Sequence, residues 1–505
     1  MMDIFNNLII GFGVAVSPIN LFYCLIGVVL GTLIGVLPGI GPVATISLLL
    51  PLTIGLDATA AIIMIAGIYY GAAYGGSTTS ILVNMPGEAS TVVTCIDGHQ
   101  MARQGRAGSA LALAAVGSFL AGTLGTVGIA TVSDVVMRYA VRFGPPEYFA
   151  MMLLGIVLVV FLSSGSIPKA LAMVALGLFF SQVGQDIVTG ETRYTADIFE
   201  LSNGIDLIPL AMGLFGISEV LLNLEHGAAR SAVAAKVGSL MPSRQEWREA
   251  AAPMARGSVL GFLLGLIPGG GPALASFASY ALERRVSRTP EQFGQGAVAG
   301  VAGPEAANNA AASGSFIPLL TLGLPSNAVM SLILGAFIMH GLTPGPLLIQ
   351  SHPEMFWGII GSMYVGNVLL LILNLPLIGL WVQLLRVPYR LLFPVILLLT
   401  IVGTYSVNHS VFDIYLLIFF GALGYVLRKW EFDLAPLVLA FVLGGQLEQT
   451  FRQALMMGRG SFDAFLARPT ALGILVLAAL LLISPALGRV RRSRSVAVKA
   501  AAETD

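Results

Sequence analysis

The chain has 505 residues, of which 56% are hydrophobic and only 10% are Asp, Glu, Lys or Arg. Soluble proteins carry about 25% charged residues, so this composition excludes a water-soluble globular protein. The formal net charge is zero, and nothing in the charge pattern indicates binding to nucleic acid.

The apolar residues lie in long blocks along the chain. A helix needs about 20 apolar residues to cross the hydrocarbon layer, and several blocks approach or exceed this length. Their residues are apolar on every face, whereas a strand of a membrane β-barrel alternates apolar and polar residues. We therefore predict an all-α, polytopic membrane protein with about ten to twelve helical segments. The clearest blocks are Ala58–Val83, Ala107–Val132, Tyr148–Leu162, Ile167–Val183, Trp357–Leu385 and Ala471–Leu487.

The first break in an apolar region lies at Gly35 to Pro42, with the sequence GVLPGIGP. An interior proline removes a helix hydrogen bond, and Pro42 suits the first turn of a new helix. One helix is therefore expected to end here and another to begin, at membrane depth. The free N–H groups of the new helix carry partial positive charge and bind a carboxylate without a basic side chain. The predicted contacts are Pro38, Gly39 and Gly41; the alternative is a kink that only helps helices to pack.

Uncharged polar residues follow the first break. The segment Tyr69 to Ser80 is rich in Gly, Ser, Thr and Tyr, and it leads to Glu88. The hydroxyl oxygens of Ser77 and Thr78 suit Na⁺ or the oxygen atoms of a substrate, although Ser and Thr also hold membrane helices together. Glu88 is a candidate carrier of a coupling proton, and the alternative is that it caps a helix end.

Charged residues outside the apolar blocks indicate the topology. Residues 185–206 are mainly acidic, whereas residues 224–256 and the C-terminus are rich in Arg and Lys. The positive-inside rule places the two basic segments in the cytoplasm and the acidic segment on the opposite face, with residues 207–223 as the span between them. The expected regions are a first membrane repeat (1–225), a cytoplasmic connecting loop (226–256), a second membrane repeat (257–488) and a basic cytoplasmic tail (489–505).

The second half of the chain repeats the first break. Residues 260–272 match residues 30–42 at eight of thirteen positions, at a constant offset of 230. The same helix–loop–helix geometry is expected, with a second set of N–H groups that bind a carboxylate. The predicted contacts of this second break are Pro268, Gly269, Gly270 and Gly271.

A looser match aligns residues 84–87 with residues 323–326. Related halves with broken helices in matching positions are typical of secondary transporters, and the breaks point to the binding site. We expect inverted repeats, whose broken helical hairpins enter the membrane from opposite faces.

Amide and carboxylate side chains accompany the second break. Amides at membrane depth are costly unless they are paired, so we favour a role in substrate or ion binding for Asn308, Asn309 and Asn327. Ser326 precedes Asn327 in a Gly-Leu-Pro-Ser-Asn segment and is a candidate ligand of the coupling ion. Glu305 is the second candidate for proton coupling, again with a helix cap as the alternative.

Several activities lack their motif. The sequence has no GxxxxGK[ST] nucleotide loop and no GxSxG nucleophile motif, and its five histidines share no metal-ligand spacing. We therefore predict that the protein is not an enzyme and holds no cofactor. The expected coupling ion is Na⁺ or H⁺, and Na⁺, without assigned ligands, is the only metal ion considered.

In these motifs the chain resembles the large permease subunit, the TctA-type protein, of the tripartite tricarboxylate transporter family. The resemblance covers nearly the whole chain except its last twenty or so residues. The segments that carry it are residues 35–42, 70–78, 84–88, 97–101, 303–310 and 322–327.

The resemblance implies a multi-pass symporter of the bacterial inner membrane. Such a subunit works with a small four-helix membrane subunit of the TctB type and a periplasmic solute-binding protein of the TctC type. Substrates of the family are citrate, other di- or tricarboxylates and some aromatic acids. Uptake is coupled to an ion gradient rather than to ATP.

We therefore predict ion-coupled uptake of a small organic anion, bound between the two Pro-Gly breaks within the lipid bilayer. A passive anion channel or an exporter of the same fold is the alternative, and a membrane enzyme is a weaker one. The choice of ion stays open, because hydroxyl-rich loops suit Na⁺ while Glu88 or Glu305 would suit H⁺.

Overall fold

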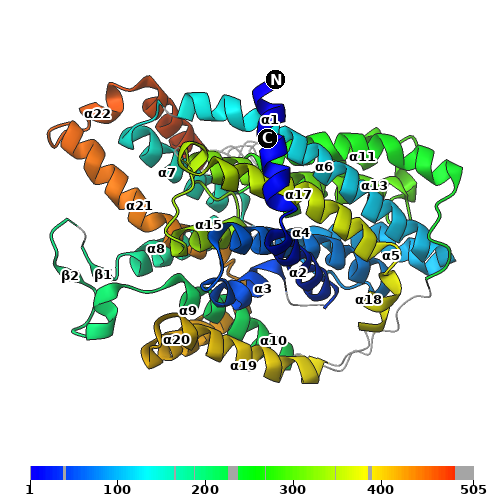
Figure 1. Cartoon of the computed structure of the whole chain (residues 1–505), viewed down its shortest axis with the longest axis horizontal. Coiled ribbons are helices and arrows are strands. Elements are labelled where there is room, and N and C mark those ends of the chain that lie inside the picture. Colours follow the sequence, from blue (N-terminus) through cyan, green and yellow to red (C-terminus); the bar gives the residue numbers. More distant parts are fainter. Residues whose placement is uncertain are drawn as a thin grey trace, which may run out of the picture.

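The computed structural model describes residues 2–37, 41–140, 142–163, 166–186, 188–225, 237–267, 269–346, 348–384 and 389–483. In these ranges the chain is almost entirely helical, with a single two-stranded antiparallel sheet (Figure 1). Within the described residues, six helices have the length and hydropathy of a membrane span, and seven shorter apolar helices of 10–17 residues accompany them. The predicted all-α, polytopic fold is confirmed, and several of the predicted apolar segments form helices shorter than a full span.

The elements follow the chain as two long series of helices. The first series is α1 (Met2–Ala15), α2 (Pro18–Val36), α3 (Pro42–Leu49), η1 (Leu50–Thr53), α4 (Ala58–Val83), η2 (Ala89–Thr91), α5 (Val92–Met101), η3 (Ala102–Arg106), α6 (Ala107–Ala140), α7 (Pro145–Leu162), α8 (Ile167–Ser181), β1 (Gly184–Gln185), β2 (Thr192–Arg193), η4 (Phe199–Asn203), α9 (Leu207–Ala211), η5 (Met212–Ile217) and α10 (Ser218–Glu225). The second series is α11 (Arg244–Gly265), α12 (Gly271–Val286), η6 (Pro290–Gln292), α13 (Ala299–Gly314), α14 (Phe316–Leu322), α15 (Ala328–Met339), α16 (Leu348–Ser351), α17 (Pro353–Asn374), α18 (Ile378–Leu384), α19 (Tyr389–Asn408), α20 (Val411–Lys429), α21 (Ala435–Met457) and α22 (Asp463–Leu466).

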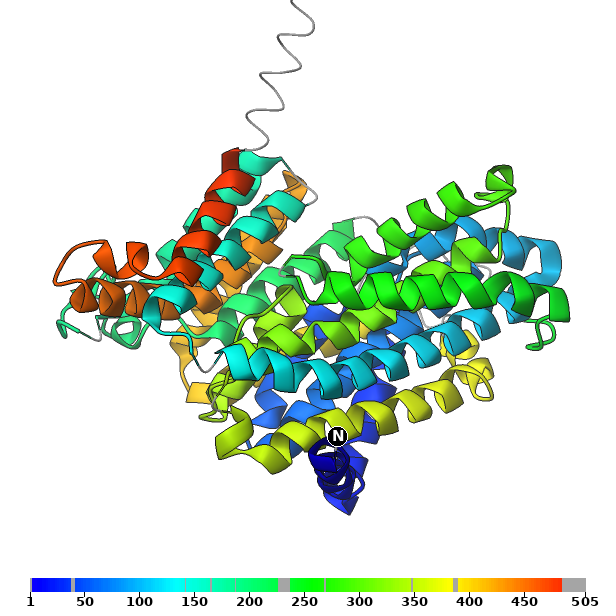
Figure 2. The same ribbon diagram turned by 90° about the horizontal axis from the view of Figure 1, so that it is seen from above.

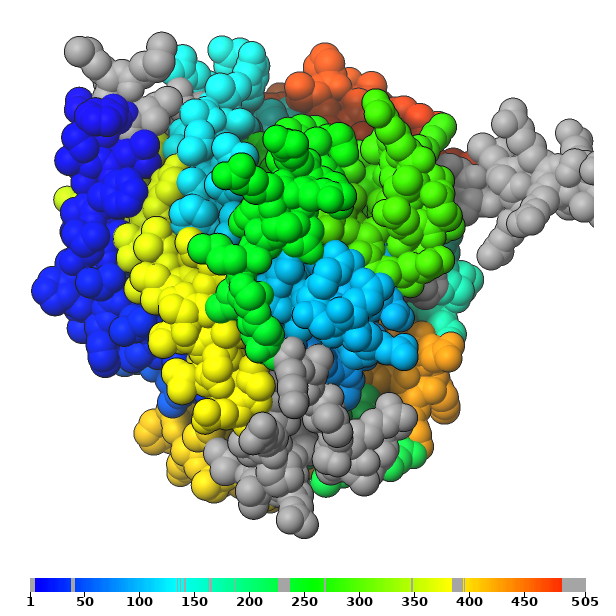
Figure 3. All heavy atoms as spheres, turned by 90° about the vertical axis from the view of Figure 1, so that its right-hand side faces the viewer, coloured from blue at the N-terminus to red at the C-terminus, as the bar shows by residue number. Residues whose placement is uncertain are grey.

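The last helix of the described residues runs at a steep angle to the central ones. In Figure 2 the red helix Pro469–Ile483 crosses the direction of the green α11 and α12. At the other end of the molecule, which faces the viewer in Figure 3, α5 (blue) and α12 (green) lie side by side. The second half of the expected connecting loop is helical, because α11 begins at Arg244. Residues 226–236 and 489–505 lie outside the described residues.

Both predicted breaks separate two helices. Helix α2 ends at Val36 and α3 begins at Pro42, and α11 ends at Gly265 while α12 begins at Gly271. Gly271 has a φ of +55°, which an L-residue adopts only at a cost. Pro38, Gly39 and Pro268, which the sequence places at the centres of the breaks, lie outside the described residues.

The helix before each break, α2 or α11, packs through a row of glycines against the second α-helix after it, α4 or α13. A Cβ atom at Gly31 would lie 2.4 Å from the carbonyl oxygen of Ile68, and one at Gly261 would lie 2.1 Å from that of Ala307. The glycines differ by 230 in number (261 − 31) and their partners by 239 (307 − 68). The α2–α4 and α11–α13 pairs therefore pack in the same way, as the predicted duplication requires.

We expect Gly261→Ala to destabilise the protein, because its Cβ atom would collide with a backbone carbonyl that cannot move aside. Overpacking of this kind costs about 1–3 kcal/mol. Thermal unfolding of the purified protein should therefore occur at a lower temperature. The matched control is Gly445→Ala in α21, where a Cβ atom meets nothing within 4 Å. Equal melting temperatures for the two variants would contradict the close helix contact.

The looser match between residues 84–87 and 323–326 also has a common geometry. Helices α4 and α14 end at Asn84 (φ 56°) and Gly323 (φ 70°), both left-handed. The next helical turns begin after Glu88 (φ −148°) and Asn327 (φ −157°), both extended. Each pair is 239 apart (323 − 84 and 327 − 88). We call residues 84–88 and 323–327 the two tips. The offset of 239 residues that relates the packing partners in α4 and α13 therefore also relates the tips.

The related helices of the two halves run antiparallel where they meet. As residue numbers rise along α4 and α5, the partners in the second half fall from α14 to the start of α13. The contacts are Tyr70 with Phe316 (5.7 Å between ring centroids), Ser77 with Glu305 (2.6 Å between oxygens) and Asp97 with Ala297 (2.8 Å from oxygen to nitrogen). Inverted repeats would meet in this direction, and both the repeats and their placement in a membrane stay predictions.

Candidate functional site

Glu305 lies in the middle of α13, where the two halves meet. Its side chain is 1% exposed, and its carboxylate accepts hydrogen bonds from Ser77 Oγ (2.6 Å) and Thr94 Oγ1. Among the described residues, no Lys or Arg forms an ion pair with it. A buried carboxylate without a cationic partner is costly when ionised, so this position favours binding of a proton or a metal cation.

Glu88 lies at the tip after α4, close to the same region. It is the N-cap residue of η2, and its carboxylate accepts from the Ser90 hydroxyl. A Cβ atom at Gly76 would lie 3.3 Å from Glu88 Cγ, so the tip packs directly on α4 beside Ser77. Glu88 therefore occupies the N-cap position that the sequence left as an alternative.

Asn308 has no hydrogen-bond partner for either atom of its amide, although it is 1% exposed. It lies near the Glu88 carboxylate without forming a bond of standard geometry. Asn308 and Glu305 are three residues apart on α13, so their side chains lie on the same side of the helix. A buried amide without a partner costs about 1–3 kcal/mol, which makes Asn308 the clearest vacant donor and acceptor for a ligand.

Asn327 and Ser326 form the tip after α14. The Asn327 amide oxygen accepts from the N–H of Met330 (3.0 Å), and its nitrogen lies 3.4 Å from the Tyr69 hydroxyl. Ser326 is fully buried, and its hydroxyl has no hydrogen-bond partner. Helix η2 after the first tip packs on α12, and α12 begins beside Asn327, so both equivalent tips border the same helix.

The second break reaches this region through Gly271. A Cβ atom there would lie 3.6 Å from Asn327 Cβ. The N–H of Gly269 donates to the Ser326 carbonyl (2.7 Å) and that of Gly270 to the Ile267 carbonyl (2.9 Å), so in this structure neither is free for a carboxylate. The N–H of Gly271 has no partner among the described residues.

Of the predicted contacts in the first break, only Gly41 lies within the described residues. Its carbonyl accepts from the Thr45 N–H (3.1 Å), and a Cβ atom at Gly41 would meet nothing within 4 Å. The structure thus brings the tips and the second break together, and it places no described residue of the first break on Asn308 or Asn327.

Two small cavities flank Glu305. Ser77 and Thr78 line one of them with Ser118, and Asn309 lines the other with Ser313. Each has about 10 Å³, close to the space of one water molecule or one small ion. The Asn309 amide nitrogen is occupied, because it donates to Ser118 (2.7 Å) and to the Glu305 carbonyl (3.1 Å). Both cavities suit an ion, and both are too small for an organic anion.

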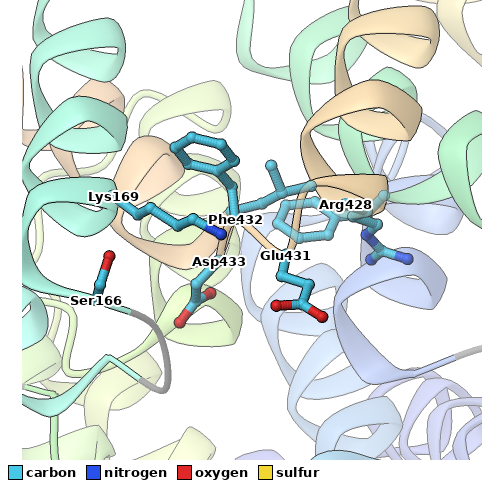
Figure 4. Close-up of a pocket in the computed structure, with 8 residues that line it drawn as sticks. Ser166, Lys169, Arg428, Glu431, Phe432 and Asp433 are labelled. Atoms are coloured by element: carbon cyan, nitrogen blue, oxygen red, sulfur yellow. The ribbon is translucent and has the colours of Figure 1, made fainter.

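A larger cavity of about 600 Å³ lies elsewhere, where α8 meets the turn between α20 and α21 (Figure 4). Three of its four charged groups have local partners: Lys169 Nζ donates to the Trp430 carbonyl (2.6 Å), Arg428 pairs with Glu219, and Asp433 accepts from Ser163. The fourth, Glu431, is acidic and would repel an anion. None of the predicted site residues lines it. Although this cavity is larger, we therefore place the candidate functional site around Glu305.

Sequence reasoning missed three contributors to the site: Thr94, Ser118 and Tyr69. Thr94 lies three residues before Asp97 in α5, and only the antiparallel packing of the halves brings it to Glu305. Ser118 is one of many small residues of α6, and nothing in its sequence context distinguishes it. Tyr69 is the first residue of the polar segment Tyr69 to Ser80, and its place in that segment could have identified it.

Comparison with known proteins gives one family and two relatives. The model of the family described as "Tripartite tricarboxylate transporter TctA family" matches residues 21–439. A protein of Agrobacterium vitis named "Uncharacterized 52.8 kDa protein in TAR-I ttuC' 3'region" is 50% identical over 494 residues, which cover 98% of both chains. Another, "Uncharacterized protein in TAR-II ttuC' 3'region", is 54% identical over 234 residues, 46% of this chain and 97% of its own. No solved structure matches the chain at a significant level.

Proposed function

Because the chain belongs to the tripartite tricarboxylate transporter TctA family, we propose that it is the large translocating subunit of an ion-coupled uptake system for small organic anions. The family is one of transporters and not of enzymes. The observation that carries the finer proposal is the buried Glu305, without a cationic partner, on the same side of α13 as the vacant amide of Asn308.

The substrate site lies between the tips and the second break. The amide of Asn308, the hydroxyl of Ser326 and the N–H of Gly271 are without partners among the described residues and supply hydrogen-bond donors for a carboxylate. Asn327 adds the second N–H of an amide whose first is directed at Tyr69. No basic side chain takes part, so the binding energy comes from neutral donors and from the start of α12. A citrate-like di- or tricarboxylate fits this chemistry.

Ion coupling follows from the charge balance. An ionised Glu305 and a carboxylate substrate repel each other at short distance in a medium of low dielectric constant. When a proton or Na⁺ neutralises Glu305, this repulsion falls and the anion binds more tightly. By linkage, the anion then strengthens binding of the ion by the same factor, so the two move together. Ser77 and Thr94 keep the carboxylate oriented, and Glu88 adds a second acidic group.

The partners are those of a tripartite system. We assign to it a small four-helix membrane subunit of the TctB type and a periplasmic solute-binding protein of the TctC type that delivers the anion. The site of action is the bacterial inner membrane, with the C-terminus in the cytoplasm. The basic segments near residues 224–256 and after residue 489 support this orientation.

Reconstitution tests the proposal. Proteoliposomes should contain this chain, its small partner and the binding protein, and labelled citrate and other carboxylates should be offered under a Na⁺ gradient or a pH gradient alone. We expect accumulation against the substrate gradient with one of the two ions. Equilibration without accumulation would favour a channel, outward movement an exporter, and a new chemical product a membrane enzyme.

Asn308→Ala is expected to raise the substrate concentration at half-maximal uptake by about tenfold or more. A hydrogen bond to a charged group contributes about 1.5–3 kcal/mol, and the variant loses both the donor and the acceptor of the amide. The control is Asn20→Ala in α2, which removes a buried amide that donates to Val14 (2.9 Å). If both variants take up substrate with the same half-maximal concentration as the wild type, Asn308 does not bind the anion.

A further inference from the structure

An exposed apolar patch lies on the segment between α8 and α9, outside the membrane-spanning helices. We call residues 184–206, without Ile187, the outer platform. Phe199 is 83% exposed, Val188 65% and Tyr194 63%. The β1–β2 hairpin projects from the left-hand end of the molecule, whereas α5 and α11 lie at the right (Figure 1). Several exposed apolar side chains on one projecting segment are typical of a binding interface.

Ion pairs fasten the outer platform to α21. Asp186 pairs with Arg193 (3.1 Å) and with Arg452 (2.9 Å), and Glu448 pairs with the same two arginines (3.0 and 2.6 Å). The N–H of Val188 and the Arg452 guanidinium hold the pKa of Asp186 at about 2, so its carboxylate stays ionised at any physiological pH. A segment held in this way presents its apolar side chains in one arrangement, which reduces the entropy lost on binding.

Three acidic side chains surround the apolar patch without an ion pair. Glu191, Asp197 and Glu200 have no cationic partner among the described residues. They alternate along the chain with Tyr194 and Phe199. Insertion of this surface into lipid would strip water from the carboxylates, and a second copy would present charge of the same sign. A basic soluble protein suits the surface better than either.

The outer platform also borders a cavity of about 470 Å³. Asn203, Gly204 and Asp206 line it from the platform, and residues of α15 and α21 line it from the membrane part. A protein bound to the platform would therefore stand beside a cavity that platform residues and membrane helices line together. This position suits a partner that hands over a small molecule.

We propose that the outer platform is the docking surface for the soluble subunit that delivers the substrate. That subunit presents Lys and Arg side chains around an apolar contact, which packs on Phe199, Tyr194 and Val188. The inference rests on the proposed tripartite function, and it adds the surface and the chemistry of the contact. Charges at the edge of an interface mainly steer association, whereas buried apolar groups mainly slow dissociation.

The test uses the full chain with its small membrane partner in lipid nanodiscs, and the purified solute-binding protein of the same system as the probe. Association and dissociation rates are measured at low and at high salt. The triple change Glu191→Gln, Asp197→Asn, Glu200→Gln should slow association about tenfold at low salt and remove most of its salt dependence. Phe199→Ala should weaken binding about tenfold through faster dissociation.

The matched controls lie near and in α11 and in η6, away from the outer platform. Met241→Ala removes a side chain with the same 83% exposure as Phe199. Glu249→Gln with Glu291→Gln removes two exposed charges. These variants should bind like the wild type.

Three outcomes would overturn the inference: no binding by the wild type, platform variants that bind like the wild type, or equal losses in the controls. Quenching of a Phe199→Trp variant by brominated lipid, with unchanged binding of the soluble protein, would assign the patch to the bilayer instead. Uptake in proteoliposomes is measured separately. Platform-dependent binding without uptake would contradict the proposed function alone, and normal uptake with unaffected variants would contradict the docking surface alone.

Discussion

Replacing Glu305 by Gln is expected to abolish ion-driven accumulation of the substrate while exchange of substrate across the membrane continues. Gln keeps the size of the side chain and still bonds to Ser77 and Thr94, but it releases no proton and carries no negative charge to attract a cation. Coupling between two ligands typically amounts to about 1–3 kcal/mol, or about 5–150-fold in affinity. The stimulation of substrate binding by the coupling ion should fall by a factor in that range.

The measurement compares two modes in the same proteoliposomes. Accumulation under an ion gradient reports coupling, and exchange of internal for external labelled substrate reports the site and its movement. Glu147→Gln is the control, because Glu147 is also buried (3% exposed) but pairs with Arg468 (2.8 Å) at the start of α7. Accumulation at the wild-type rate by Glu305→Gln would show that the ion binds elsewhere.

The same variant separates the two candidate ions. If the ion is H⁺, Gln imitates the protonated carboxyl group, and exchange should become independent of pH. If the ion is Na⁺, Gln loses a charged ligand, and a higher Na⁺ concentration should partly restore substrate binding. Glu88→Gln should have the smaller effect in either case, because Glu88 is only partly buried whereas Glu305 is 1% exposed.

The breaks and the tips could be predicted from sequence because their signals are local. Pro and Gly end a helix wherever they stand together, and the recurrence at an offset of 230 marked Gly271 without any knowledge of packing. The candidate role of Asn308 could also be predicted from the sequence, since an unpaired amide in an apolar segment is costly. The vacant amide and the occupied N–H groups of Gly269 and Gly270 required coordinates, because both depend on which side chains face them.

The partners of Glu305 could not be predicted for a related reason. Ser77 and Thr94 are 228 and 211 residues away in the chain, and the antiparallel meeting of the halves brings them together. Small hydroxyl residues are common in all the apolar segments, so composition does not distinguish these two. The resemblance marked the segment that contains Asp97, but it gave no indication of what that carboxylate binds.

Asp97→Ala is expected to be the most destabilising of the changes considered. The carboxylate is fully buried and accepts three backbone N–H groups, from Gly294 (2.9 Å), Gly296 (2.8 Å) and Ala297 (2.8 Å), as well as the Tyr280 hydroxyl (2.9 Å). Alanine leaves these donors unpaired, and each costs about 1–3 kcal/mol. A loss of about 4 kcal/mol or more follows, which should appear as a much lower melting temperature or as failure to accumulate in the membrane.

Asp97→Asn and Tyr280→Phe make the argument specific. The Asn oxygen still accepts the three N–H groups, and its nitrogen faces a hydroxyl that also accepts, so the loss should be less than half that of Ala. Tyr280→Phe removes one hydrogen bond and should cost about 1 kcal/mol. The order Ala, Asn, Phe in decreasing effect distinguishes a carboxylate that ties α5 to the start of α13 from a merely buried residue. Because α13 carries Glu305 and Asn308, a loosened start of that helix should also weaken substrate binding in Asp97→Asn. Equal melting temperatures for Asp97→Ala and the wild type would contradict the role of Asp97 in holding α5 and α13 together.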